Sequence, residues 1–332
     1  MDISVLTCGD PKAEAILFIH GNLSSSIFWA QTMMALQDEF ACMAPDLRGF
    51  GATEPLKVDA TLGLDDMAAD LFALTDLLAR SRFHVVGHSM GGGVAMKMML
   101  MRPQALRSVT LVNTISPYGY SGSIDKKGTP CHADGSPGGA GYVDAEFVRR
   151  LAMGDRGQDS AFSPRSVLSQ LYFKPPFIPR NFEALLDSML STRIGDDWYP
   201  GNTVKSHCGP GLAPGERGIV NAMSRRYFDA SGIVNIQPKP PLLWVRGTED
   251  LIVCEQGQST NTDPEGADGG KQASTALQPM IKQTRSVLKD YRYKGGSVIE
   301  HPIEDAGHTP FLEKPAEFNR ALVQFVRSAK GS

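Results

Sequence analysis

The chain has 332 residues, 42% of them hydrophobic and 21% charged, and its formal net charge is -3 at pH 7. This balance is typical of a globular protein with a sizeable core, and the lack of a basic surplus argues against a nucleic-acid-binding protein. We see neither a signal peptide nor an apolar run of the ~20 residues needed to cross a bilayer, so we expect a cytoplasmic protein without a membrane partner.

In the first third of the chain, short apolar runs alternate with amphipathic stretches. The apolar runs predict buried strands at 15–19, 40–44, 83–86 and 108–112. The stretches between them predict helices at 28–36, 64–78 and 90–101. This alternation predicts an α/β fold, in which a mostly parallel, doubly wound sheet carries helices on both faces.

The same alternation returns near the C-terminus. There the pattern predicts strands at 242–245 and 297–301 and helices at 276–291 and 315–326. Between the first of these strands and the helix that follows it, residues 256–270 are polar and rich in glycine, which predicts a mobile surface loop.

Residues 118–232 break the alternation. They are rich in Gly, Pro, Ser and aromatic residues, with two short helical patterns near 164–172 and 181–191. Because the sheet pattern resumes afterwards, we interpret this stretch as an inserted helical cap on a single core formed by residues 1–117 and 233–332. A second globular domain is the alternative interpretation.

Five cysteines are scattered along the chain. Their odd number and the absence of C-x-x-C spacing argue against a disulfide framework or a zinc site, so we expect free thiols. Cys131 and Cys208 are the two that could pair in an oxidising compartment.

Ser89 lies at the centre of the motif Gly87-His88-Ser89-Met90-Gly91. The motif directly follows one predicted strand and directly precedes the next predicted helix. In that setting G-x-S-x-G indicates a nucleophile elbow, a strained turn that presents the serine hydroxyl above the sheet. The two glycines are needed because a side chain at either position would collide with crowded backbone. The free N–H groups of the helix start stabilise developing negative charge.

With this motif the sequence resembles the α/β-hydrolase fold family, and in particular its serine-nucleophile, esterase- and lactonase-like members with a helical cap. His20-Gly21-Asn22 follows the first buried strand, where the family carries its oxyanion loop. The resemblance implies that the backbone N–H groups of Asn22 and Met90 form the oxyanion hole. It also implies that Asp46–Gly51, a D-x-R-G-x-G stretch, has a structural role as a tight turn with an Arg–Asp network.

A serine nucleophile needs a base, and the base needs an orienting acid. His308 lies on the loop between the last predicted strand and helix, where the family carries its catalytic histidine. The strand 242–245 leads to Asp250 at the family's usual acid position, with Glu249 as the alternative. The preceding strand ends in Val112-Asn113-Thr114 without a carboxylate, which favours Asp250. The chain order Ser–Asp–His agrees with the fold.

The resemblance implies acyl transfer through an acyl-enzyme, without a metal or organic cofactor. Dehalogenases and epoxide hydrolases of this family have an aspartate at the Ser89 position, so they are excluded. The aromatic residues of the cap favour a small-molecule substrate, a carboxylic ester or lactone with a bulky apolar acyl group.

Several alternatives stay open. One is a carbon–carbon bond hydrolase, and another is an aminopeptidase whose cap carboxylates hold an amine. A non-catalytic ligand-binding protein and a homodimer are also compatible with the sequence. The carboxylates that an aminopeptidase could use are Asp144, Glu146, Asp196 and Asp197.

The chain departs from the family pattern in two places. Only one short strand fits before Ala15, so we expect the family's first strand to be missing or vestigial. The interval between Asp250 and His308 is longer than is common, because of the polar stretch after the acid.

Overall fold

Seven strands form the central sheet of the computed structural model, which describes residues 1–209, 211–255 and 278–329. Their order is β1-β3-β2-β4-β5-β8-β9, and every neighbouring pair is parallel except β1 with β3. The predicted α/β fold with a mostly parallel sheet is confirmed. The strands are β1 (Val5–Cys8), β2 (Glu14–Ile19), β3 (Phe40–Pro45), β4 (Phe83–His88), β5 (Leu106–Val112), β8 (Leu242–Gly247) and β9 (Val298–Ile303).

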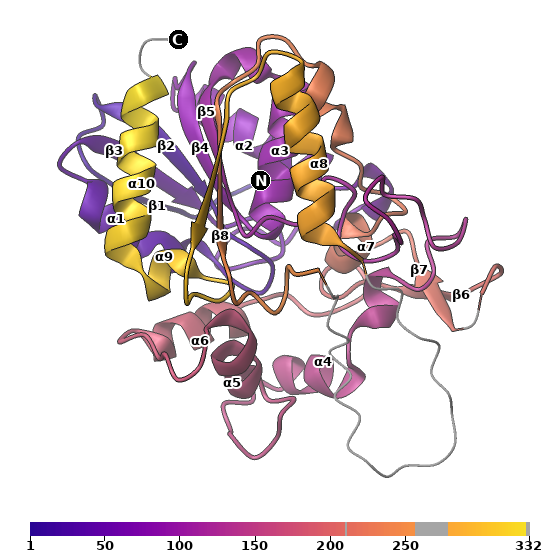
Figure 1. The fold of residues 1–332 in the computed structure, drawn as a ribbon. Coiled ribbons are helices and arrows are strands. Elements are labelled where there is room, and N and C mark those ends of the chain that lie inside the picture. The colour runs from indigo at the N-terminus through magenta and orange to yellow at the C-terminus, as the bar shows by residue number, and fades with distance from the viewer. Residues whose placement is uncertain (210, 256–277, 330–332) are drawn as a thin grey trace.

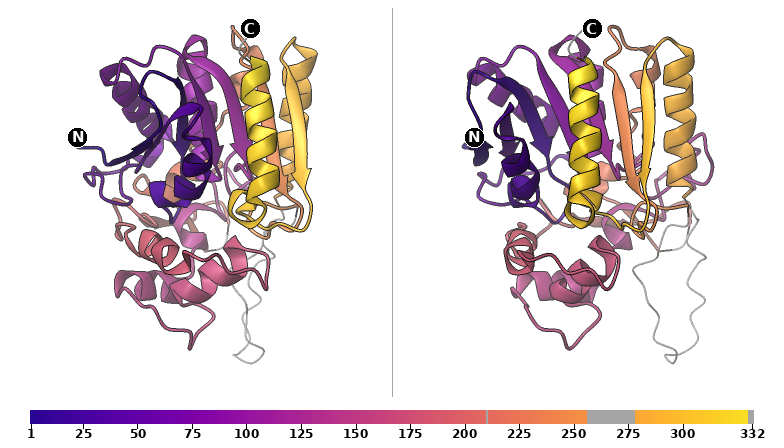
Figure 2. Two further views of the ribbon diagram at one scale, coloured as in Figure 1. Left: turned by 90° about the vertical axis from the view of Figure 1, so that its left-hand side faces the viewer. Right: turned by 60° about the vertical axis from the view of Figure 1, so that its left-hand side comes forward.

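Helices cover both faces of this sheet (Figure 1). On one face lie α1 (Ala30–Leu36) and α10 (Pro315–Ser328). On the other face lie α2 (Asp65–Leu77), α3 (Met90–Met101) and α8 (Met280–Tyr293), as the turned views of Figure 2 also show. The sheet is therefore doubly wound, and the carboxyl ends of its parallel strands meet at one edge, where ligands bind in open α/β sheets.

The first strand and the first helix differ in detail from the elements expected from the sequence. The one short strand that fits before Ala15 is β1, which has four residues and pairs antiparallel with β3 at the sheet edge. The segment predicted as one helix begins as a 3-10 helix, η1 (Ser26–Trp29), before α1. The carboxylate of Asp46 accepts the Ser26 N–H at 2.8 Å and so fixes this tighter turn, which hydrophobic periodicity cannot reveal.

Most of the segment between β5 and β8 lies across the carboxyl ends of the parallel strands, below them in Figure 1. The two helical patterns predicted there correspond to α5 followed by a π-helix, η5, and to α6. The polar stretch 256–270, predicted as a surface loop, lies outside the described residues. The elements of the segment are η4 (Gly139–Tyr142), α4 (Ala145–Ala152), α5 (Pro164–Val167), η5 (Leu168–Tyr172), α6 (Phe182–Leu190), β6 (Thr203–Lys205), β7 (Leu212–Pro214), α7 (Ile219–Met223) and η6 (Ser231–Asn235).

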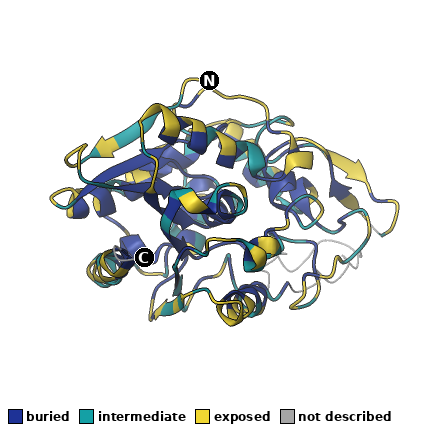
Figure 3. Ribbon diagram, turned by 90° about the horizontal axis from the view of Figure 1, so that it is seen from above, coloured by how far each residue is buried: buried dark blue, intermediate teal, exposed yellow. Residues whose placement is uncertain are grey.

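The apolar runs that predict the strands form the core. Ala15–Ile19 are buried throughout, and Figure 3 shows buried strands and inner helix faces surrounded by exposed outer faces. Within the described ranges, no helix combines the length and apolar character that a membrane span requires. All five cysteines carry free thiols, so Cys131 and Cys208 are not joined.

Candidate active site

Ser89 occupies the turn between β4 and α3, and its backbone is strained. Its φ is 53° and its ψ is -116°, outside the regions open to L-residues. A Cβ built on Gly87 would lie 2.3 Å from the Gly91 carbonyl oxygen, and one built on Gly91 would lie 2.4 Å from that of Ile19. The predicted need for glycine at both positions is confirmed.

Replacing Gly91 with alanine should lower the free energy of unfolding by about 3 kcal/mol, because the new methyl group overlaps backbone carbonyls that cannot move aside. Gly232→Ala is the matched control, since a Cβ there meets its nearest neighbour, Leu100 Cδ2, at an ordinary 3.4 Å. Urea unfolding measures both variants. Equal losses in the two would contradict the steric account of the turn.

Asp250 and His308 come together at the carboxyl edge of the sheet. His308 Nδ1 lies 2.9 Å from Asp250 Oδ2 and donates to it, since a carboxylate can only accept. The other carboxylate oxygen, Oδ1, accepts the backbone N–H groups of Ile252 at 2.8 Å and Val253 at 3.1 Å. Both members of the pair are buried, whereas the neighbouring Glu249 is exposed.

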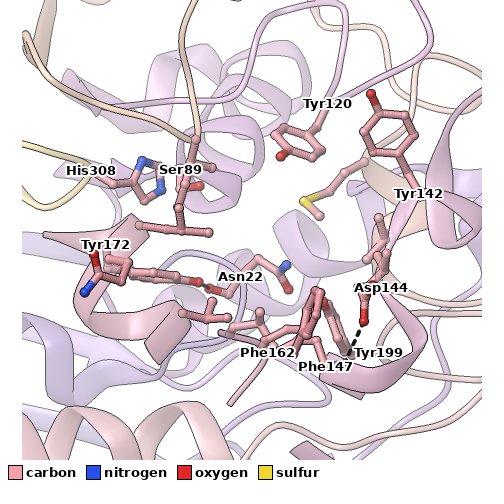
Figure 4. Close-up of a pocket in the computed structure, with 18 of the residues that line it drawn as sticks. Asn22, Ser89, Tyr120, Tyr142, Asp144, Phe147, Phe162, Tyr172, Tyr199 and His308 are labelled. Carbon is pink, nitrogen blue, oxygen red and sulfur yellow. Dashed lines mark hydrogen bonds between the residues drawn. The ribbon is translucent and has the colours of Figure 1, made fainter. Parts of the chain in front are cut away.

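Ser89 and His308 line the same cavity, of about 400 Å³. Figure 4 shows the two side chains next to each other at one end of it, with Asn22 on the adjoining wall. Met90, the other residue expected in the oxyanion hole, is the first residue of α3 and directly follows Ser89. The structure therefore brings together all five residues selected from the sequence.

Residues 14–127 match a family model described as alpha/beta hydrolase fold. This range contains β2 to β5 and the strained turn at Ser89. The match covers less than half of the chain, and the seven-stranded, mostly parallel sheet around that turn gives the fold of the described residues. The chain has the α/β-hydrolase fold.

Curated relatives of this α/β-hydrolase-fold protein match part of its length. The dihydrolipoyllysine-residue acetyltransferase component of the acetoin cleaving system of Cupriavidus necator is 34% identical over 139 residues, 42% of this chain and 33% of the relative. A proposed carbamate hydrolase, RutD, of Variovorax paradoxus is 36% identical over 109 residues, 32% of this chain and 41% of the relative. The chain spans less than half the length of these relatives.

Among solved structures, a proposed aryl esterase from Burkholderia cenocepacia superimposes on this α/β-hydrolase-fold protein with a TM-score of 0.62. The match covers 99% of this chain and 96% of the other, at 20% sequence identity. At that identity the likeness concerns the fold alone.

Sequence reasoning overlooked Asn113, which lies at the end of β5 in a left-handed conformation with φ 41°. Its Nδ2 donates to Asp250 Oδ2 at 2.6 Å, the same oxygen that accepts from His308. Its Oδ1 accepts the Gly247 N–H at 3.2 Å, which fixes the orientation of the amide. The sequence does show a polar residue at the end of this strand, but the catalytic acid was expected to be a carboxylate, so the amide was passed over.

Two further histidines in this α/β-hydrolase-fold protein have structural roles, because their rings form hydrogen bonds with backbone groups of neighbouring loops. His20 Nε2 accepts the Leu47 N–H at 2.9 Å, so its proton is on Nδ1, which donates to the Gly21 carbonyl at 2.7 Å. His88 Nε2–H donates to the His308 carbonyl at 2.9 Å. Burial lowers the pKa of His20 and lowers that of His88 further, so both rings stay neutral.

The stretch Asp46–Gly51 contains the expected Arg–Asp network, in which the arginine of the stretch binds aspartates of α2. Arg48 binds Asp66 at 2.9 Å and Asp70 at 2.7 Å on α2, while the Asp46 carboxylate caps backbone N–H groups. Neither Asp46 nor Arg48 lines the cavity. The Arg–Asp network thus ties this loop to α2 and leaves the cavity to other side chains.

The cavity wall is mainly apolar and aromatic, with phenol groups from Tyr120, Tyr142 and Tyr199. Burial raises the pKa of the Tyr120 and Tyr199 phenols well above the ordinary value, so they remain protonated donors. The apolar lining comes from Leu23, Ile115, Val143, Phe147, Ala161, Phe162, Val167, Leu171, Val220, Met223 and Ile252. Most of these residues belong to the segment between β5 and β8, in which the sequence analysis named one lining residue, the carboxylate Asp144.

Proposed function

We propose that the chain is a serine hydrolase that cleaves a carboxylic ester or lactone with a bulky apolar acyl group. The observation that carries this proposal is a serine on a strained turn beside a histidine bound to a buried carboxylate, at one end of an apolar cavity. Each group has a role in acyl transfer, and none requires a metal or organic cofactor.

In the proposed cycle, His308 keeps its proton on Nδ1 because Asp250 accepts it, which leaves the Nε2 lone pair for the Ser89 hydroxyl. Ser89 Oγ attacks the substrate carbonyl carbon while its proton moves to His308. The backbone N–H groups of Asn22 and Met90 hold the oxyanion. His308 then protonates the departing alcohol, and a water molecule activated by the same base frees the acid and restores Ser89.

The substrate class follows from the cavity wall. A largely apolar cavity of about 400 Å³ buries a medium-sized or aromatic acyl group and leaves few polar groups for a charged one. The named activities of the relatives, aryl esterase and carbamate hydrolase, are acyl-group cleavages of the same kind. We therefore place aryl and medium-chain esters first and lactones and carbamates next.

An aminopeptidase is disfavoured because its candidate carboxylates already bind other groups. Asp144 caps α4 by accepting the backbone N–H groups of Glu146 at 2.8 Å and Phe147 at 3.1 Å. The remaining three form ion pairs, Glu146 with Arg149 and Arg150, and Asp196 and Asp197 with Arg217. An ester carries no amine, so its binding does not require such a carboxylate.

A panel of p-nitrophenyl esters of rising chain length, phenyl acetate, lactones, a phenyl carbamate and aminoacyl anilides tests the proposal. We expect the highest kcat/KM on medium-chain or aryl esters, and covalent labelling of Ser89 by a fluorophosphonate. Ligand binding without turnover or labelling would instead indicate a non-catalytic binding protein. Anilide cleavage above ester cleavage would indicate an aminopeptidase.

A further inference from the structure

The end of the π-helix η5 makes contacts with both loops that complete the site. Tyr172 is its last residue, and Tyr172–Lys174 run between the His308 loop and the loop that contains Asn22. π-helices are rare and occur mostly as single turns at functional sites. This position makes the segment a candidate for shaping the site from outside the central sheet.

The first contact reaches the oxyanion loop. The Tyr172 hydroxyl donates to the backbone carbonyl of Asn22 at 3.0 Å, as Figure 4 shows for the two side by side. The Tyr172 ring is buried and stands nearly perpendicular to the His308 ring, with 5.7 Å between the ring centroids and 88° between the ring planes. Burial raises the pKa of this phenol, so it remains a protonated donor at neutral pH.

The other contacts reach the histidine loop. Thr309 Oγ1 donates to the Tyr172 carbonyl at 2.9 Å. The buried Glu313 carboxylate accepts the Lys174 N–H at 2.8 Å on one side and the N–H groups of Gly307 at 2.9 Å and Thr309 at 3.2 Å on the other. One short piece of chain is therefore hydrogen-bonded to Asn22 itself and to Thr309, the residue next to His308.

We propose that Tyr172 is a positioning residue, whose hydroxyl holds Asn22 so that its backbone N–H points at the oxyanion. The inference rests on the proposed serine-hydrolase function and deepens it, because it makes the segment between β5 and β8 part of the transition-state machinery. The physical reason is that an oxyanion donor is effective only when it is fixed before the charge develops. The hydroxyl bond fixes the peptide group that follows Asn22, and this restrains the backbone torsions of Asn22 that set the direction of its own N–H.

Tyr172→Phe removes the hydroxyl and keeps the ring that lines the cavity. We expect kcat on p-nitrophenyl esters to fall about 10-fold, less than the roughly 10²–10³-fold that loss of an oxyanion donor itself causes. KM should change less than about twofold, because the apolar wall is unchanged. The affinity for phenylboronic acid, which forms a tetrahedral adduct with the serine, should fall in parallel with kcat.

Tyr291→Phe is the matched control. The Tyr291 hydroxyl is also buried and donates to a backbone carbonyl, that of Pro240, at 2.7 Å. Pro240 precedes the start of β8, at the opposite end of the sheet from the site. Both variants should lower Tm to a similar extent, but Tyr291→Phe should keep wild-type kcat and boronic-acid affinity.

Two results would overturn the inference. An active wild-type protein whose Tyr172→Phe variant keeps kcat and boronic-acid affinity removes the positioning role, and so does an equal loss in Tyr291→Phe. A wild-type protein that neither cleaves the esters nor binds the boronic acid overturns the proposed function itself, and the inference with it.

Discussion

Ser89→Ala is expected to abolish hydrolysis of every ester in the panel, lowering kcat on the order of 10⁶-fold. In the proposed mechanism the hydroxyl is the group that forms a bond with the acyl carbon, so no neighbouring side chain replaces it. The fold should remain, because Ser89 makes its structural contacts through its backbone: its N–H donates to Val112 and its carbonyl accepts from Gly92 and Ile115. Fluorophosphonate labelling and hydrolysis, measured together, check this result.

A second variant at the same position distinguishes the loss of the hydroxyl group from the relief of backbone strain. Ser89→Gly should be as inactive as Ser89→Ala, but more stable to urea by about 1 kcal/mol, because glycine adopts φ 53° and ψ -116° without the penalty paid by a residue with a Cβ. Retained activity in either variant would rule out Ser89 as the nucleophile. Equal stability of the two would remove the argument that this turn is strained.

Much of the fold and of the candidate site could be predicted because its signals are local. Buried parallel strands are continuous apolar runs, and the Ser89 turn carries its glycines within two residues. His308 and Asp250 were selected because they follow predicted strands at the places where the resembled family carries its histidine and its acid, and parallel strands bring such loops to one edge of the sheet. The first strand could not be given bounds, because β1 has just four residues and none of them is fully buried.

The rest of the site depends on contacts that no local pattern encodes. Tyr172 lies 150 residues from Asn22 in the chain, in a segment without a sustained period. Asn113 was visible as a polar strand end, yet its importance depends on the direction of its amide, which is set by Gly247 on a neighbouring strand. The proposed preference for an apolar acyl group likewise depends on which side chains of that segment line the cavity with Ser89.

Asp250→Asn should lower kcat about 10⁴-fold while KM changes little, because it reverses the tautomer of the base. Oδ1 of Asp250 is bound by the N–H groups of Ile252 and Val253, so in the variant the amide oxygen keeps that place. The NH₂ group must then take the place of Oδ2. There the NH₂ group meets the Nδ1–H of His308 and the Nδ2–H₂ of Asn113. All three groups are hydrogen-bond donors, so none of them has an acceptor.

The three donors can be satisfied only if the proton of His308 moves from Nδ1 to Nε2, so that Nδ1 accepts from the new amide. Nε2 then has no lone pair to accept the proton of Ser89. Asn113 must also turn, and it then loses the bond from the Gly247 N–H. Glu249→Gln is the matched control, because it neutralises an exposed carboxylate one residue away and should change kcat less than about twofold. Steady-state kinetics on the best ester decide between them: a large loss in Glu249→Gln with an active Asp250→Asn would assign the acid to Glu249.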